Sequence, residues 1–154
     1  MEDDIKRMEG HVKVTRMDLS GKGEDELIAA LKQTGADIHM TCWRSPKTTA
    51  KVMEAAPQYK YMAHCAGGIR DQVTREAIAA GLLVTNWGNV TSRSTAEGAF
   101  AMTFAVLRNY HLMQDWVRRD RLYWETPRAD EGLFEQRVGL HGLGAIAQEY
   151  AKML

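Results

Sequence analysis

The feature that most constrains the fold is an alternation of short apolar segments with helix-forming segments along the first 85 residues. Residues 37–43, 59–65 and 82–85 have the length and composition of buried strands. A helical pattern at 24–33 precedes them, and two more lie between them, from Ser45 to the residue before Pro57 and at 74–80. Strands that alternate with helices are joined by right-handed crossovers, and their sheet is parallel. The sequence therefore predicts an α/β fold.

Local signals set the ends of these elements. Gly35 is suited to a left-handed cap at the end of the first helix, and Ser45-Pro46 is a favoured helix start, with serine as N-cap and proline in the first turn. The alternation in residues 11–16 also predicts a half-buried strand, after a weak helical pattern at 3–9.

Charge excludes several classes of partner. Twenty basic and twenty acidic residues cancel to a net charge of zero, which removes the electrostatic reason to expect nucleic acid or an anionic membrane surface. The first residues are acidic and no long apolar run follows them, so we expect neither a signal peptide nor a membrane span. A cytoplasmic protein that binds a small molecule or another protein is the expectation.

The two cysteines, Cys42 and Cys65, are far apart in sequence and form no CxxC pair. This spacing favours neither a disulfide framework nor a zinc site, and we expect buried, reduced thiols. His39 and Cys42 would point to opposite faces of a strand, so we predict no metal site.

A long helix is predicted from Ser94 to Arg119. Ser94 and Glu97 form a capping-box pattern at its start, and its apolar residues do not fit one narrow stripe. Such a helix needs several neighbours or a second chain to cover it, so we expect it to bridge domains or form a subunit interface. An ordinary core helix is the alternative.

Two glycine-rich loops are candidate binding sites. The first, Gly142-x-Gly144-x-x-Ala147, follows a predicted strand at 137–141 and opens a helix, which is the context of a dinucleotide-binding turn. The glycines would let the backbone turn tightly and approach a pyrophosphate, and the start of the helix favours an anion. An ordinary strand-to-helix turn is the alternative. The acidic residue expected about 20 positions further on would lie past Leu154.

The second loop, with Gly67, Gly68 and Arg70, lies at the carboxyl end of a predicted parallel strand, where open α/β sheets bind ligands. Its backbone N–H groups, helped by Arg70, would hold a carboxylate. A tight turn with a solvated arginine is the alternative. His64 and His141 flank the two loops and are more typical of structural residues.

Four segments together resemble the D-isomer-specific 2-hydroxyacid dehydrogenases. They are YKYMAHCAGG at 59–68, EAIAAGLLVTN at 76–86, TAE at 95–97 and VGLHGLG at 138–144. The resemblance implies a parallel, flavodoxin-like substrate domain over residues 1–93, with its first strand missing. It also implies a long helix and the first β-turn-α of a Rossmann domain that binds NAD or NADP over residues 94–154, with the rest of that domain missing.

The resemblance also implies roles for particular residues. Gly67 and Gly68 would bind the carboxylate of a small 2-hydroxy or 2-oxo acid, Thr95 would approach the nicotinamide end, and the long helix would form a homodimer. The residues that would hold the pyrophosphate are Gly142, Leu143, Gly144, Ala145 and Ile146. Arg70 and Thr91 depart from the residues common in the family, aspartate and asparagine, so substrate identity does not transfer.

The family's catalytic arginine, glutamate and histidine all lie in the second half of its cofactor domain. The resemblance therefore assigns no catalytic residue to this chain. We expect an oxidoreductase of this family that is seen in part and is inactive as 154 residues alone. A non-catalytic module used for dimerisation or ligand binding is the alternative.

Overall fold

A computed structural model describes residues 2–119, 132–134 and 136–154 of the chain. The chain divides into two compact units, Met1–Gly88 and Asn89–Leu154, which are described separately. Within the described ranges, no helix is both long enough and apolar enough to cross a membrane.

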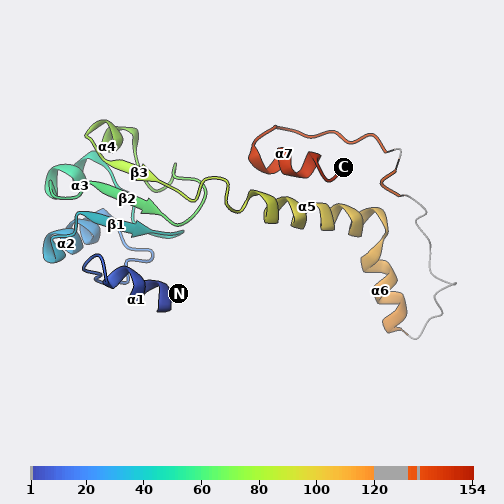
Figure 1. The fold of residues 1–154 in the computed structure, drawn as a ribbon, viewed down its shortest axis with the longest axis horizontal. Helices are drawn as coiled ribbons and strands as arrows, with labels where there is room; N and C mark the ends of the chain where they lie inside the picture. The colour runs from blue at the N-terminus through green and yellow to red at the C-terminus, as the bar shows by residue number, and fades with distance from the viewer. Residues whose placement is uncertain (1, 120–131, 135) are drawn as a thin grey trace. The chain divides into compact units, whose positions relative to one another are not determined.

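The first unit is built on a three-stranded parallel sheet (Figure 1). Its strands are β1 (Ile38–Thr41), β2 (Tyr61–His64) and β3 (Leu83–Thr85), side by side in the order β1-β2-β3. Thr41 pairs with His64, and Ala63 with Thr85. Since all three strands run in the same direction, their carboxyl ends share one edge. The predicted α/β class is confirmed.

Four helices accompany this sheet, α1 (Glu2–Glu9), α2 (Glu24–Thr34), α3 (Ala50–Ala55) and α4 (Arg75–Ala79). The predicted end of α2 is confirmed, because Gly35 adopts the left-handed conformation (φ 66°) and its N–H donates to Leu31 O. At the start of α4, the Thr74 hydroxyl accepts a hydrogen bond from Ala77 N.

The core lies where α2, α3 and α4 bury apolar side chains against the sheet. Leu27, Val52, Tyr59 and Met62 have no exposed surface. Burial of this kind stabilises the fold by about 1.5–3 kcal/mol for each large side chain. The remaining buried members of this cluster are Leu31, Met53, Ala56, Val73, Ala77 and Leu82.

The predicted helix start at Ser45 is wrong. Helix α3 begins at Ala50, because Thr48 is held in an extended bridge to Val73. Thr48 N donates to Gln72 O at 2.8 Å, and Thr74 N donates to Thr48 O at 3.0 Å. A pairing with a segment far along the chain thus overrides the local signal.

The strand predicted at 11–16 is also wrong, since residues 13–19 lie outside any helix or strand. The N–H groups of His11 and Val12 donate to Met8 O and so prolong the end of α1. A strand requires a paired neighbour, and the strand pairing within the described ranges involves other segments.

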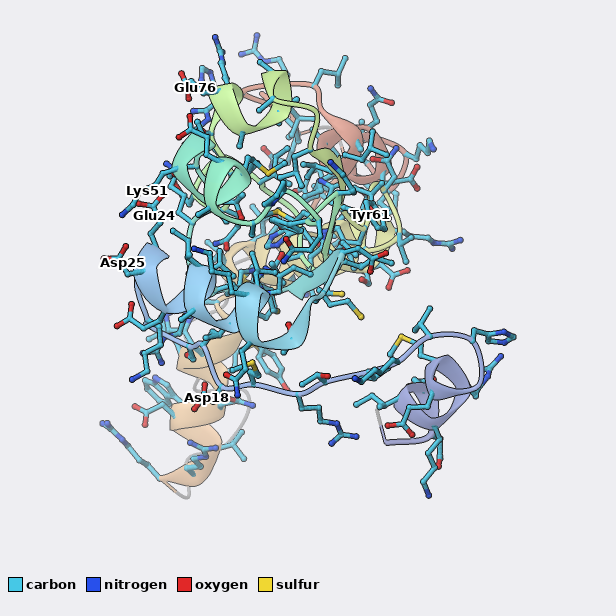
Figure 2. All side chains as sticks on the ribbon, turned by 90° about the vertical axis from the view of Figure 1, so that its left-hand side faces the viewer. Asp18, Glu24, Asp25, Lys51, Tyr61 and Glu76 are labelled. Carbon is cyan, nitrogen blue, oxygen red and sulfur yellow. The ribbon has the colours of Figure 1, made fainter. Side chains whose placement is uncertain are left out.

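A surface ion cluster ties α2 to α3. Lys51 Nζ lies 2.7 Å from Asp25 Oδ1 and 3.6 Å from Glu24 Oε2, and Figure 2 shows Lys51 beside both carboxylates. The Thr49 hydroxyl donates to Glu24 as well. The hydrogen bond with Asp25 and its negative charge raise the pKa of Lys51.

The second unit contains α5 (Ser92–Leu107), α6 (Tyr110–Arg118) and α7 (Ala145–Ala151). The prediction of one helix from Ser94 to Arg119 is therefore wrong. It is interrupted at Arg108 and Asn109, where Asn109 has a left-handed backbone (φ 46°). The start was also misplaced: Thr91 precedes the first turn, and the Ser94 hydroxyl donates to Thr91 O at 3.2 Å.

Helix α7 packs against α5 through aromatic contacts. The rings of Phe100 and Tyr150 lie 6.0 Å apart, edge to face, and the hydroxyls of Thr103 and Tyr150 are 2.7 Å apart. The strand predicted at 137–141 is wrong, because residues 136–140 belong to no strand. The described part of this unit contains no strand with which they could pair.

Candidate functional site

Three loops meet the carboxyl edge of the parallel sheet in the first unit. Residues 42–46 follow β1, residues 65–70 follow β2 and residues 86–88 follow β3. Because the strands are neighbours in register, the loops start side by side. This edge is where open parallel sheets bind their ligands.

The loop after β2 is fastened to the loop after β3. The Asn86 side chain donates to Gly67 O, and Trp87 N donates to Ala66 O at 3.3 Å. The Asn86 side chain also accepts from Gly88 N at 3.0 Å, which closes its own turn. These bonds fix the backbone of Ala66 and Gly67, and Ala66 is fully buried.

Gly67 and Gly68 present backbone donors. Within the described part of the chain, neither N–H group has a hydrogen-bond acceptor. A Cβ at Gly67 would come 3.2 Å from the Trp87 indole nitrogen, whereas one at Gly68 would meet nothing within 4 Å. A Cβ at Gly67 would therefore crowd the Trp87 ring, whereas the position that a Cβ would take at Gly68 is open space. Arg70, two residues on, is exposed.

His64 is a structural residue, as predicted. Its side chain is 3% exposed, and its Nδ1 lies 2.8 Å from the Thr41 hydroxyl on the neighbouring strand. His39, on β1, is also removed from solvent in large part, and burial lowers its pKa. Because the His64 imidazole is buried and contacts Thr41 on β1, it stabilises the sheet and is not accessible to a substrate.

Two tryptophan rings, one from the loop after β1 and one from the loop after β3, contact each other and form a rim. The sequence did not predict this contact. Trp43 and Trp87 closely follow β1 and β3, and their rings pack edge to face with centroids 6.0 Å apart. Trp43 remains 66% exposed. Their positions just past strand ends were the available signal, but their contact depends on how strands distant in sequence are ordered in the sheet.

The expectation of buried thiols is wrong. Cys42 and Cys65 are both free and exposed, because each is the first residue past its strand. Cys42 Sγ lies 3.7 Å from the carbonyl oxygen of Cys65.

The second candidate site lies in the second unit, at the turn before α7. Gly142 has φ 89°, a value that favours glycine, and Gly144 precedes the helix. A Cβ at either glycine would meet no atom within 4 Å, so the backbone there is open to approach. Leu143 is 68% exposed, and its carbonyl accepts a hydrogen bond from the Gln148 side chain at 3.1 Å.

A hollow of about 290 Å³ adjoins this turn, between the first turns of α5 and α7. It is lined by Asn89, Ser92, Arg93, Ala145, Gln148 and Glu149. Ala145 therefore borders this hollow, and the neighbouring Ile146 is 45% exposed. Thr95 is exposed, and its hydroxyl donates to Thr91 O at 2.8 Å.

No group of three or more histidine, cysteine, aspartate or glutamate side chains comes together as a metal site in the residues that the structure covers. The polar groups at the two sites include the backbone N–H groups of Gly67 and Gly68 with the exposed Arg70 in the first unit. In the second unit they include the backbone of the glycine turn and the side chains of Asn89, Ser92, Arg93, Gln148 and Glu149. Both arrangements are suited to anions.

Comparison with solved structures shows where this fold occurs. The chain superposes on the NADPH-dependent glyoxylate/hydroxypyruvate reductase of Sinorhizobium meliloti with a TM-score of 0.74 and 23% identity, over 97% of this chain and 45% of that one. It superposes on the NAD-dependent formate dehydrogenase of Staphylococcus aureus with a TM-score of 0.67 and 19% identity, over 99% and 45%. At these identities the likeness shows the fold.

Sequence comparison extends the likeness to curated relatives. The chain is 30% identical over 137 residues to the D-3-phosphoglycerate dehydrogenase of Mycobacterium tuberculosis, covering 88% of this chain and 25% of that protein. It is 29% identical over 135 residues to the glyoxylate reductase of Pyrococcus furiosus, covering 83% and 39%. The chain therefore spans between a quarter and two fifths of the length of these relatives.

Residues 1–143 match the family model of the D-isomer specific 2-hydroxyacid dehydrogenase catalytic domain, and this match covers the loop of Gly67 and Gly68 and reaches Leu143 in the glycine turn before α7. The chain belongs to the D-isomer-specific 2-hydroxyacid dehydrogenases, a family of oxidoreductases.

Proposed function

We propose that this chain carries the substrate-carboxylate loop and the first part of the dinucleotide site of an NAD(P)-dependent oxidoreductase that interconverts a 2-hydroxy acid and a 2-oxo acid. The observation that carries the proposal is the pair of N–H groups at Gly67 and Gly68, which have no acceptor among the described residues and lie at the carboxyl edge of a parallel sheet. A backbone N–H group that a loop holds in place, and that has no acceptor among the described residues, is free to bind a ligand at this edge of the sheet.

A carboxylate suits this loop for three reasons. Two successive N–H donors match its two oxygens, Arg70 adds a positive charge within the same loop, and Gly68 leaves the approach open. The loop is also held from behind by Asn86. Because Arg70 departs from the aspartate common in the family, the proposal extends to the class of 2-hydroxy and 2-oxo acids and to no single member of it.

The cofactor is proposed from the relatives and from the fit of the glycine turn before α7. The Sinorhizobium reductase has been solved with NADP and the Staphylococcus dehydrogenase with NAD. Gly142, Leu143, Gly144, Ala145 and Ile146 would hold the pyrophosphate with backbone N–H groups, which the open space at both glycines allows. When bound, the dinucleotide supplies or accepts the hydride. Thr95 is proposed to lie toward the nicotinamide end.

The domain assignment follows from these roles. We propose residues 1–93 as part of the substrate domain and 94–154 as the start of the NAD(P)-binding domain. No acid–base residue is assigned, because His64 is buried against Thr41. We propose that the 154 residues alone do not turn over substrate.

Amide NMR tests the carboxylate loop directly. Glyoxylate titrated into the ¹⁵N-labelled chain should shift the Gly67 and Gly68 resonances, whereas glycolaldehyde, which lacks the carboxylate, should not. Arg70→Gln should weaken the response about tenfold, since a charge-assisted bond contributes about 1.5 kcal/mol. The matched control, Arg93→Gln, lies in the other unit and should leave it unchanged. Shifts that avoid residues 66–70, or an unaltered response in Arg70→Gln, would count against the proposal.

A second candidate function, dimerisation, rests on the exposed apolar side chains of α5 and α6. These are Met102, Phe104, Val106, Tyr110, Leu112 and Val117, each at least 39% exposed. Many exposed apolar side chains on two consecutive helices favour a protein interface, and we propose a homodimer through these helices. Light scattering should report a dimer that Val106→Glu weakens and Gln114→Glu does not. A monomer at high micromolar concentration would contradict this candidate.

A further inference from the structure

The chain's two cysteines stand opposite each other across neighbouring parallel strands. The register pairs Thr41 with His64 as the last residues of the two strands, and Cys42 and Cys65 directly follow them. Cys65 N donates to Thr41 O at 2.7 Å, which holds the two strand ends together at this point. Neighbouring strands lie about 4.8 Å apart. A disulfide needs Cα atoms separated by roughly 4.4–6.8 Å, and the usual spacing of neighbouring strands falls within this range.

The sulfur positions agree with this placement. Cys42 Sγ lies 3.7 Å from the carbonyl oxygen of Cys65, so it reaches across to the partner residue. Cys65 Sγ lies 4.0 Å from Ala63 O, on its own strand, and would have to rotate about its Cα–Cβ bond to meet Cys42. Both thiols are exposed, which gives an oxidant access and leaves room for that rotation.

We propose that Cys42 and Cys65 form an oxidisable pair, which a peroxide converts into an intramolecular disulfide beside the carboxylate loop. Each thiol first releases its proton to solvent. One thiolate attacks the peroxide, the O–O bond breaks, and a sulfenic acid and hydroxide result. The second thiolate then attacks that sulfur, the S–S bond forms and a second hydroxide leaves, and the two hydroxides take up the two released protons as water. In total, two thiols and one hydrogen peroxide give one disulfide and two waters, and two electrons pass from sulfur to oxygen.

The position of the bond gives it a consequence for ligand binding. Cys65 is two residues before Gly67, and Cys42 opens the loop that carries Trp43. A disulfide would join these two loops covalently and turn the Cys65 side chain away from Ala63. Oxidation should therefore alter the environment of the Gly67 and Gly68 amides, whether or not the chain binds a carboxylate.

Peptide mapping tests the pair. The native chain is treated with hydrogen peroxide, alkylated and digested with trypsin without reduction. Cleavage after Lys32, Arg44, Lys60 and Arg70 gives peptides 33–44 and 61–70, each with one cysteine. We expect these peptides to be joined, with the loss of two hydrogens from a chain of monomeric mass, and to separate on treatment with dithiothreitol.

Two controls keep the result specific. Cys42→Ser and Cys65→Ser should each lose the joined peptides and instead give a sulfenic or sulfinic acid at the remaining thiol. Chain unfolded in urea should form the joined peptides more slowly than native chain at the same peroxide concentration. Oxidation of both cysteines to separate sulfinic acids, disulfides only between chains, or equal rates in native and unfolded chain would each overturn the proposal.

Discussion

Alkaline unfolding should reveal the buried hydroxyl of Tyr59. This side chain has no exposed surface, and burial raises its pKa from 10.0 to about 12. The Thr48 hydroxyl opposes the rise only weakly, since among the described residues neither hydroxyl makes a hydrogen bond of regular geometry. The folded state thus resists ionisation of Tyr59 across about two pH units.

The sign and size of the effect follow from linkage. Below pH 10 the phenol is protonated in both states and does not affect the pH dependence. Between pH 10 and about 12 the unfolded state releases the proton while the folded state keeps it, so the free energy of unfolding falls as the pH rises. The slope is about 1.4 kcal/mol per pH unit, and the total loss is about 2.7 kcal/mol.

Urea unfolding followed by far-UV circular dichroism, repeated from about pH 8 to about pH 11.5, measures this slope. Tyr59→Phe should unfold with nearly parental stability at the low end of this range, because the lost hydroxyl has no regular partner, and should lose less stability at high pH. Tyr61→Phe is the matched control: it removes a hydroxyl from β2 that lies 2.6 Å from the Thr85 hydroxyl but leaves Tyr59 in place. If Tyr59→Phe and the parent lose stability with the same slope, the argument from burial is refuted.

Three further predictions test the same structure. Burial lowers the pKa of His39, so its contribution to stability should be full above pH 6.5 and decline as the pH falls below it; His39→Gln should flatten that decline in urea titrations. Leu27→Ala, at a side chain with no exposed surface, should lower the free energy of unfolding by about 2.7–5 kcal/mol, while Leu83→Ala, 68% exposed, should change it by less than about 0.5 kcal/mol. Asn109→Val should lower the thermal midpoint through about 1 kcal/mol of left-handed strain, and Asn109→Gly should preserve or raise it; equal midpoints would show that the break between α5 and α6 carries no strain.

The sheet could be predicted because its signals are local. A helix whose apolar pattern ends at a glycine cap, as α2 ends at Gly35, can be identified without knowing which segments pack against it. Parallel pairing then follows from the crossover rule rather than from any one residue. The resemblance to a family added the proposed roles of Gly67 and Gly68, which composition alone could not separate from an ordinary turn.

Two of the wrong predictions and one missed contact share a different cause. The Ser45-Pro46 signal was overridden by the bridge from Thr48 to Val73, and the strand at 137–141 has no partner within the described ranges. The Trp43–Trp87 rim depends on the order of strands. Each outcome is decided by a contact between distant segments, and the hydrophobic period of a sequence does not encode such contacts.

The bridge between Thr48 and Val73 also bears on the thermodynamics of the carboxylate binding proposed for this loop. Residues 65–73 are anchored at one end by β2 and at the other by two backbone hydrogen bonds to Thr48, while Asn86 holds the middle. A loop restrained at both ends and in between has few conformations left to lose when an anion arrives. Association with a carboxylate should therefore carry a small entropic penalty, and loosening the distant bridge would weaken affinity without touching any group that contacts the ligand.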